Sequence, residues 1–442
     1  AQLVSEAIDF DADFKGRVIS HAKALTGLPN PASGEQLKRW IEREEGFFPA
    51  SITKDNLPEL IRQVQKPEVK EMLKLKQLMS KTSVKKYEAM RRARCDDGRV
   101  HGLLQFYGAN RTGRWAGRLV QVQNLPRNSM SELDDARELL RSGNTYAIEM
   151  IYAHPLDVLS QLIRTAFVPR DGYRFMVADF SAIEARVIAW LAGEKWRMKV
   201  FADGGDIYCA SASKMFGVPV EKHGINGHLR QKGKIAELAL GYQGSIGALK
   251  AMGADKLGLS DEELQEIVNS WRKASPRIKR LWYDVDAAAL EAVRECRAVT
   301  LHHGVAFSYR KGILFIRLPS GRKLAYVRPK IEIEPEFNRE GLTYEGSEQT
   351  SGKWTRLRTY GGKLVENIVQ AIARDCLAVA MKRLEGVGFR IVMHIHDEVV
   401  IECHADACDL MDVCRIMGEP IDWAKGLTLT ADGYITGYYK KD

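Results

Sequence analysis

The sequence predicts an α+β fold, in which helical segments and strands occupy separate stretches of the chain. Residues 15–95 carry apolar side chains at helical spacing, and Ser33 followed by Gln36 is typical of a helix start. Residues 300–361 instead show the pattern of strands, with P-S-G at residues 319–321 as a hairpin signal. Two further apolar runs end in carboxylates, and the functional prediction depends on them.

The composition is that of an ordinary globular protein, with 442 residues, 45% apolar residues and a formal net charge of +9. This length allows two or three domains, and the positive charge is compatible with binding a polyphosphate without proving it. We find no signal peptide and no apolar run of membrane-spanning length. Seven scattered cysteines without a C-x-x-C pair indicate a reducing compartment. Cys403, His404, Cys408 and Cys414 fit no standard zinc spacing.

The first carboxylate is Asp179, which follows the apolar run at residues 175–178. The pattern becomes helical from residue 184 to residue 191. A strand that ends at an aspartate before a helix places that carboxylate at the edge of a sheet. Most such residues merely cap the helix, so Asp179 alone decides nothing.

The second carboxylate lies in M-H-I-H-D-E-V-V-I-E, residues 393–402, where apolar residues flank His396-Asp397-Glu398 as in a β-hairpin tip. Two acidic tips 218 residues apart, at positions 179 and 397, suggest one sheet that presents both carboxylates at one place. Two such charges ~4 Å apart would repel by roughly 4 kcal/mol at an effective dielectric constant of 20. Divalent cations remove this repulsion, and oxygen-only ligands favour Mg²⁺ or Mn²⁺.

Five motifs, in order, resemble those of family A DNA polymerases, the DNA polymerase I class. The stretch M-V-A-D-F-S-A-I-E-A-R around Asp179 is similar to the first catalytic motif, and H-D-E to the last. The other three are T-G-R with Q-N-L-P (residues 112–126), R-Q-K-G-K-I-A-E-L-A-L-G-Y of the fingers helix (residues 230–242), and E-N-I-V-Q-A-I-A-R-D (residues 366–375). The resemblance covers nearly the whole chain, and its details favour the phage-encoded branch.

The resemblance implies a right-hand architecture, with an α-helical thumb and fingers and a palm built on an antiparallel sheet. Residues 1–95 would be the thumb, residues 96–200 and 313–442 the two parts of the palm, and residues 201–312 the fingers. The thumb would begin with a short acidic lead-in at residues 1–14, which we expect to be a solvated edge or linker. Residues 66–94 contain ten Lys or Arg against three Glu and would follow the phosphate backbone.

The implied reaction is DNA-templated addition of a deoxynucleotide to a primer 3′ end, with release of pyrophosphate, by a two-metal mechanism. Asp179 and Asp397 would hold two Mg²⁺ ions, for which Mn²⁺ could substitute, and the carbonyl of Phe180 would complete the second site. Glu398 is a third nearby carboxylate and not an obligatory ligand. Lys234 would bind phosphate and protonate the leaving pyrophosphate.

The remaining substrate residues follow from the same resemblance. Arg230 would hold the γ-phosphate, and Tyr208 stands where the family usually has a phosphate-contacting histidine, although a tyrosine has no charge at neutral pH. Glu184 would exclude a ribose hydroxyl at the sugar C2′, as a steric gate. Leu238 replaces the aromatic residue that packs beside the incoming nucleotide, and a buried spacer remains its alternative role. Tyr242 completes the helical stripe.

Five residues are expected to contact DNA. The forked donors of Arg114, Gln123 and Asn124 suit phosphates and the minor-groove acceptors that every base pair presents. Gln370 matches the family glutamine that contacts the minor groove, and His396 matches the histidine at the primer end. The implied partners are primer–template DNA and dNTPs, for a monomer without a membrane in the cytosol of a bacterial or phage-infected cell. The sequence identifies no accessory replication protein.

Two alternatives remain open at this point. A single-subunit RNA polymerase shares the palm but lacks the glutamate of S-x-I-E, which is present here as Glu184. A non-catalytic DNA-binding module would not need the paired aspartates. The one D-x-E of the chain, residues 261–263, opens a predicted helix as a cap, so we expect no proofreading exonuclease in this chain.

Overall fold

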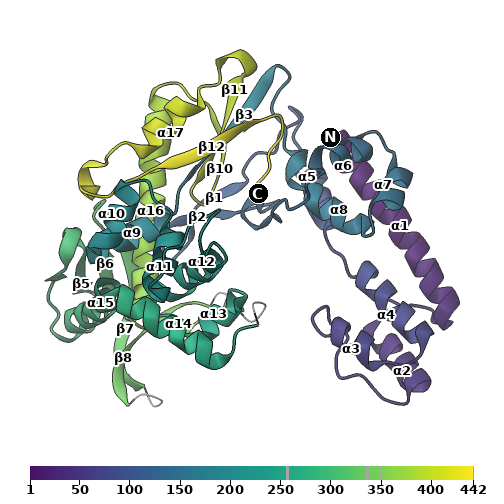
Figure 1. Cartoon of the computed structure of the whole chain (residues 1–442), viewed down its shortest axis with the longest axis horizontal. Helices are drawn as coiled ribbons and strands as arrows, with labels where there is room; N and C mark the ends of the chain where they lie inside the picture. The colour runs from purple at the N-terminus through teal and green to yellow at the C-terminus, as the bar shows by residue number, and fades with distance from the viewer. Residues whose placement is uncertain (255–257, 335–337, 349, 442) are drawn as a thin grey trace. The chain divides into compact units, whose positions relative to one another are not determined.

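The computed structural model describes residues 1–254, 258–334, 338–348 and 350–441, which form two compact units (Figure 1). The first unit contains residues 1–105, 117–175 and 436–442, and the second contains residues 106–116 and 176–435. Within the described ranges, we find no helix with both the length and the apolar character needed to cross a membrane. The boundaries of thumb, palm and fingers given above remain predictions.

The first unit is mainly helical. Its helices are α1 (Gln2–Thr26), α2 (Gly34–Glu45), α3 (Leu57–Gln63), α4 (Pro67–Met79), α5 (Val84–Ala93), α6 (Leu133–Arg141), α7 (Thr145–Ile151) and α8 (Pro155–Leu162). Ser33 caps α2 by accepting a hydrogen bond from the Gln36 N–H, as predicted. The expected lead-in was wrong, because α1 begins at Gln2 and its buried Asp11 pairs with Lys15 one turn later at 2.9 Å.

A four-stranded sheet carries both predicted acidic tips. Its strands, in spatial order, are β10 (Ile391–Ile395), β11 (Glu398–His404), β3 (Tyr173–Phe180) and β12 (Ala431–Thr436). Strands β10 and β11 pair antiparallel with Ile395 opposite Glu398, so His396 and Asp397 form a two-residue turn. The hairpin predicted at this position is confirmed.

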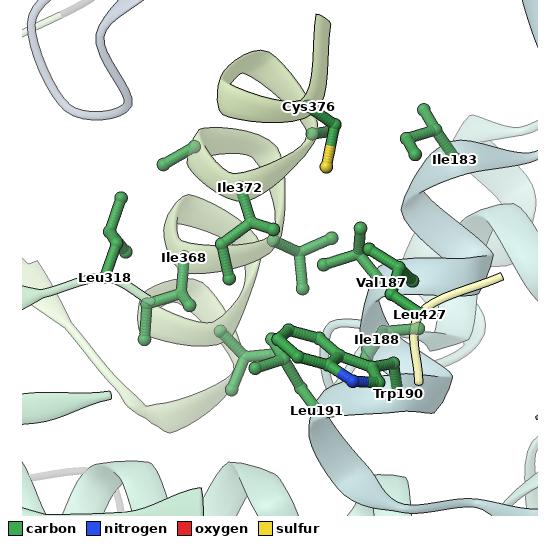
Figure 2. Close-up of a cluster of buried hydrophobic side chains, with 14 of the residues drawn as sticks. Ile183, Val187, Ile188, Trp190, Leu191, Leu318, Ile368, Ile372, Cys376 and Leu427 are labelled. Carbon is green, nitrogen blue, oxygen red and sulfur yellow. The ribbon is translucent and has the colours of Figure 1, made fainter. Parts of the chain in front are cut away.

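Two helices contribute many side chains to the main core. Helix α9 (Ile183–Ala192) begins directly after the first motif, and α16 (Gly361–Gly386) carries the E-N-I-V-Q motif. Figure 2 shows the buried side chains that join them, among them Val187 and Trp190 of α9 and Ile368 and Ile372 of α16. This packing fixes the helix that follows Asp179.

The described part of residues 195–294 contains the helices α10 (Lys195–Ala202), α11 (Ile207–Phe216), α12 (Leu229–Leu240), α13 (Ile246–Ala251), α14 (Asp261–Ala274) and α15 (Pro276–Arg294). Ser260 and Glu263 form a complete capping box at the start of α14. The interpretation of D-x-E as a helix cap is therefore confirmed. Trp271 of α14 and Trp282 of α15 stack with ring centroids 6.1 Å apart, which ties these two helices together.

The predicted β region forms a second, antiparallel sheet. Its strands are β4 (Val299–Thr300), β5 (Ala306–Arg310), β6 (Ile313–Arg317), β7 (Lys323–Glu334), β8 (Arg339–Ser347) and β9 (Trp354–Thr359), in this order. Residues 319–321 turn between β6 and β7, as predicted. A two-stranded ribbon, β1 (Leu104–Ala109) and β2 (Arg114–Gly117), contains the T-G-R motif, and α17 (Leu410–Gly418) precedes β12.

One covalent feature was not expected from the sequence. Cys403, near the end of β11, forms a disulfide with Cys408, whereas the cysteine spacing had suggested a reducing compartment. In the described part of the chain, no three or more His, Cys, Asp or Glu residues are grouped to hold a metal ion. A zinc site at residues 403–414 therefore finds no support.

Candidate active site

The structure brings the two predicted acidic tips together. Asp179 is the penultimate residue of β3, and Asp397 lies in the turn between β10 and β11. The N–H of Phe180 donates to the carbonyl of Asp397 at 3.3 Å, so the backbones beside the two carboxylates are joined directly. Both aspartates are half-buried, whereas His396 is exposed in a left-handed conformation with φ of 55°.

This donor set fits a hard divalent cation, because the Asp179 and Asp397 carboxylates and the Phe180 carbonyl supply only oxygen atoms. Glu398 is only 2% exposed and begins β11, so it is set back from the surface on which His396 lies. Because the described residues contain no group of three such side chains, a cation here would need further oxygens. Magnesium commonly takes them from water and substrate phosphates.

A buried arginine fixes the loop that follows Asp179. Arg186 donates from Nε to the Ser181 carbonyl at 2.7 Å and from Nη2 to the Thr430 hydroxyl at 2.6 Å. The Ser181 N–H in turn donates to the Thr430 carbonyl at 2.9 Å. The sequence analysis missed this positioning role, although the final arginine of the first motif, on a helix otherwise rich in apolar residues, was its visible signal.

Glu184, the predicted steric gate, is held by two other predicted site residues. Its Oε1 accepts from Nη2 of Arg114 at 2.7 Å, and its Oε2 accepts from the Tyr242 hydroxyl at 2.6 Å. Burial and the charge of Glu184 raise the pKa of Tyr242 well above its usual value. The hydroxyl therefore stays protonated and donates to the carboxylate.

The T-G-R ribbon is held in place through its carbonyl groups. Arg322 donates to the Thr112 carbonyl at 2.7 Å, and Arg374 donates to the Gly113 carbonyl at 3.1 Å. Asp375 pairs with these two arginines at 2.8 and 3.2 Å. Gly113 has φ of 72°, and a Cβ there would lie 2.3 Å from Nη1 of Arg322, so only glycine fits. Sequence reasoning missed Arg322, Arg374 and Asp375.

Arg230 and Tyr208 also come together, through a residue that the sequence analysis missed. Asp206 accepts from Nε of Arg230 at 2.8 Å and caps α11 by accepting from the Tyr208 N–H at 2.8 Å. The Arg230 guanidinium carbon lies 5.2 Å from the Tyr208 ring centroid. Burial acts to raise the pKa of Asp206, but hydrogen bonds from the Cys209 N–H and from Arg230 outweigh it and lower that pKa. The sequence feature that could have identified Asp206 is its position directly before a helical run, where an aspartate typically caps the helix.

A close approach of α11 and α12 makes this contact possible. A Cβ at Gly233 would lie 2.2 Å from the carbonyl of Tyr208, so any larger residue would push the helices apart. On the same helix, Glu237 accepts from Ser211 of α11 at 2.6 Å and from the Trp271 indole of α14 at 2.8 Å, and it pairs with the fully buried Arg197 of α10. Helix α12 is therefore anchored to three neighbouring helices.

Two predicted substrate residues of the anchored helix α12 differ in their exposure. Lys234 lies one turn after Arg230 and is half-buried. Leu238 is 49% exposed, so its alternative role as a buried spacer is wrong. Gly241 follows the last residue of α12 and keeps a helical φ of −56°, so it does not bend the helix beneath Leu238.

The predicted DNA contacts fall in both units. Gln370 of α16 lies one turn after Glu366 and donates to it at 3.3 Å. Burial raises the pKa of Glu366, with opposition from Lys363 and a further increase from the nearby charge of Glu184. Gln123 and Asn124 belong to the first unit, in a 3₁₀ turn at residues 122–124, where Gln123 is half-buried and Asn124 is exposed.

Comparison with known proteins identifies the family to which a chain with these features is similar. The sequence model of the family described as DNA polymerase family A matches residues 20–295. The chain is 58% identical over 440 residues to a DNA polymerase of Bacillus phage SP02, covering 100% of this chain and 68% of that protein. It is 28% identical over 269 residues to the thermostable DNA polymerase I of Thermus aquaticus, covering 60% of this chain and 26% of that protein.

The fold is also similar to that of a known DNA polymerase. A solved structure, the POL domain of Pol1 from M. smegmatis in complex with DNA primer-template and dNTP, matches with a TM-score of 0.62 at 19% identity, covering 99% of this chain and 66% of that one. The mixed α+β fold predicted from the sequence is thereby confirmed as that of a polymerase domain. The chain belongs to DNA polymerase family A. The expected enzyme class, a DNA-directed DNA polymerase, is confirmed with it, as is the predicted similarity to phage enzymes.

Proposed function

We propose that this chain adds deoxynucleotides to the 3′ end of a DNA primer under the direction of a template strand. The main support for this proposal is the hydrogen bond from the Phe180 N–H to the Asp397 carbonyl, which joins the strand end bearing Asp179 to the turn bearing Asp397. The two carboxylates and the Phe180 carbonyl would hold two Mg²⁺ ions, or Mn²⁺ in their place. When bound, these ions would lower the pKa of the primer hydroxyl and neutralise charge on the triphosphate.

The residues of α12 bind the triphosphate and help pyrophosphate to leave. Asp206 accepts from Nε of Arg230 and pairs with its Nη2, which orients the guanidinium for the γ-phosphate. Lys234 binds phosphate one turn further along, and the helix N-terminus adds a favourable dipole. The primer 3′ hydroxyl gives its proton to water as its oxygen bonds to the α-phosphorus. Lys234 gives a proton to the pyrophosphate oxygen as the bond between that oxygen and the α-phosphorus breaks.

The held carboxylate of Glu184 selects the sugar. Arg114 and Tyr242 fix both of its oxygens, so it lies against C2′ of a deoxyribose and excludes a ribose hydroxyl. We assign minor-groove and primer-end contacts to Gln370, His396, Gln123, Asn124 and Arg114. A monomer that binds primer–template DNA and dNTPs in the cytosol accounts for all of these roles.

Primer extension with labelled dNTPs and rNTPs tests the proposal directly. Wild type is expected to extend with dNTPs in Mg²⁺ or Mn²⁺ and to stop when the metal is chelated. Asp179→Ala and Asp397→Ala should each abolish extension and still bind primer–template, because binding comes from cations spread along the DNA path. Asp203→Ala, which removes the exposed carboxylate directly after α10, is the matched control. Extension within tenfold of wild type by either active-site variant would refute the metal assignment.

A further inference from the structure

One face of the six-stranded sheet can be defined from its pairing. Residues directly opposite each other on paired strands point to the same face, and so do alternate residues along a strand. Arg310 of β5 lies opposite Ile313, Ile313 opposite Val327, Val327 opposite Glu345, and Glu345 opposite Arg356 of β9. This row of five residues crosses the sheet and defines what we call the outer face.

The outer face carries a concentrated positive charge. Its cations are Arg310, Arg317, Lys323, Arg328, Lys330, Arg339, Arg356 and Arg358, and its carboxylates are Glu332, Glu334 and Glu345. This excess of five positive charges is more than half of the net charge of +9 of the whole chain. The opposite face is apolar, and its buried side chains, such as Phe307, Leu314 and Tyr326, belong to the main core.

Some of the charges on this face lower the stability of the sheet. Arg317 and Lys323 lie directly opposite each other, and like charges in that position destabilise a strand pair. Glu345 is shared by two cations, Arg328 at 2.9 Å and Arg356 at 3.1 Å. Within the described residues, no carboxylate pairs with Arg317 or Lys323, and both side chains are exposed.

Two aromatic rings lie among these cations. Trp354 is 62% exposed and stands two residues before Arg356, on the same face of the edge strand β9. Phe315 lies on β6, and the amino group of Lys323 is 5.9 Å from its ring centroid. Cations that alternate with accessible aromatic rings form the platform on which proteins bind unpaired nucleic acid.

The outer face lies close in sequence to one contact of the candidate active site, through the hairpin turn between β6 and β7. Arg317 and Lys323 flank the hairpin turn between β6 and β7, and the adjacent Arg322 donates to the Thr112 carbonyl of the T-G-R ribbon at 2.7 Å. Two residues further along this ribbon, Arg114 holds Glu184. The Arg317–Lys323 pair therefore lies next to a residue that holds the T-G-R ribbon of the candidate active site.

We propose that the outer face of strands β5–β9 binds single-stranded DNA, supplied by the unpaired template or by a displaced strand. This inference rests on the proposed polymerase function. Four inter-strand spacings of about 4.8 Å give the face a width of roughly 19 Å, enough for several nucleotides. Arg310, Arg317 and Lys323 contact phosphates, while Trp354 stacks on a base.

The test compares two charge-matched triple variants. One carries Arg310→Gln, Arg317→Gln and Lys323→Gln on the outer face, and the other carries Lys382→Gln, Arg390→Gln and Lys425→Gln at exposed sites elsewhere. Fluorescence anisotropy measures their affinity for three labelled substrates over a range of salt concentrations. These are a primer–template with a template overhang of about two nucleotides, one with about twenty, and a nicked duplex with a displaced strand of about twenty, lengths chosen around the usual site sizes.

The outer-face variant should bind the short-overhang substrate like wild type and lose about tenfold or more in affinity for one or both single-stranded substrates. The substrate that responds identifies the source of the strand. The salt slope for that substrate should fall by about two, since a single-strand phosphate contact contributes about 0.7. Trp354→Ala should weaken the same substrate by at least about fivefold and leave its salt slope unchanged.

Equal losses on all three substrates, or equal losses in both triple variants, would overturn the inference, as would the absence of any loss. The last result would leave a protein partner as the occupant of this face. Primer extension on the short-overhang substrate is measured in parallel. If wild type extends it and the outer-face variant behaves as wild type in every assay, the sheet inference fails and the proposed function stands.

Discussion

Tyr242→Phe tests whether the predicted steric gate depends on how its carboxylate is held. The Tyr242 hydroxyl donates to Oε2 of Glu184 at 2.6 Å, and Arg114 holds Oε1 at 2.7 Å. Because the pKa of Tyr242 is raised by burial and by Glu184, the hydroxyl remains a donor through neutral and mildly alkaline pH. The substitution removes this one hydrogen bond and keeps the aromatic ring.

The expected loss of sugar selectivity follows from the strength of that bond. A hydrogen bond to a charged group contributes about 1.5–3 kcal/mol, and about 1.4 kcal/mol corresponds to a factor of ten. If this free energy fixes Glu184 against the sugar, the preference for dNTP over rNTP falls by about 10–150-fold in Tyr242→Phe. Glu184→Ala should lose at least as much. The double variant should match Glu184→Ala, because the hydroxyl then has no carboxylate to orient.

Single-turnover incorporation of a dNTP and of the matching rNTP on one primer–template gives the preference for each variant. Tyr283→Phe, which removes the hydroxyl of an exposed tyrosine on α15, controls for the substitution itself. A preference that falls in Glu184→Ala and is unchanged in Tyr242→Phe would show that the carboxylate acts without this anchor. An unchanged preference in both variants would move the gate to another residue.

Three further predictions follow from the site and its surroundings. Lys234→Ala should slow single-turnover incorporation at saturating dNTP by about 10²–10⁴-fold, and a change in apparent affinity alone would make Lys234 a binding residue instead of an acid. Wild type should discriminate strongly against ddNTPs, because the exposed Leu238 has no hydroxyl to replace the missing 3′-OH, and Leu238→Tyr should raise the ddNTP/dNTP incorporation ratio. Burial, aided by Arg374, lowers the pKa of His394 to about 4, so the unfolded chain takes up this proton first and stability falls as the pH drops from about 6.5 toward 4. Urea unfolding at pH 7 and pH 5 should show a fall that is about 2 kcal/mol larger in wild type than in His394→Phe, and equal falls would contradict it.

The features that the sequence predicted correctly depend on neighbours in the chain. The Ser33 cap, the capping box at Ser260 and the hairpin turn at residues 319–321 each use side chains or backbone within a few residues. The prediction of a lead-in at residues 1–14 was wrong because its apolar residues Leu3, Ala7 and Phe10 are buried along one side of α1. The i to i+4 pair of Asp11 with Lys15 then stabilises the helix instead of a solvated edge.

The features that the sequence did not predict are contacts between distant segments. Motif spacing identified Arg230 and Glu184. A single sequence does not show that Asp206 lies beside Arg230, or that Arg114 and Tyr242 donate hydrogen bonds to Glu184. Such partners become visible only when the fold sets their distances. They matter because a bound guanidinium or carboxylate has already lost the side-chain freedom that substrate binding would otherwise have to remove.

In α12, contacts made by one side of the helix likewise determine the exposure of the other side. Its Glu237 side is anchored to α10, α11 and α14 by a buried ion pair and two further hydrogen bonds, so the helix cannot rotate without breaking all three. Leu238, the next residue, is consequently held outward and remains half-exposed in spite of its apolar side chain. The buried polar network around Glu237 therefore determines that Leu238 is exposed. That placement is the structural reason to expect Leu238, and not a neighbour, to meet the incoming nucleotide.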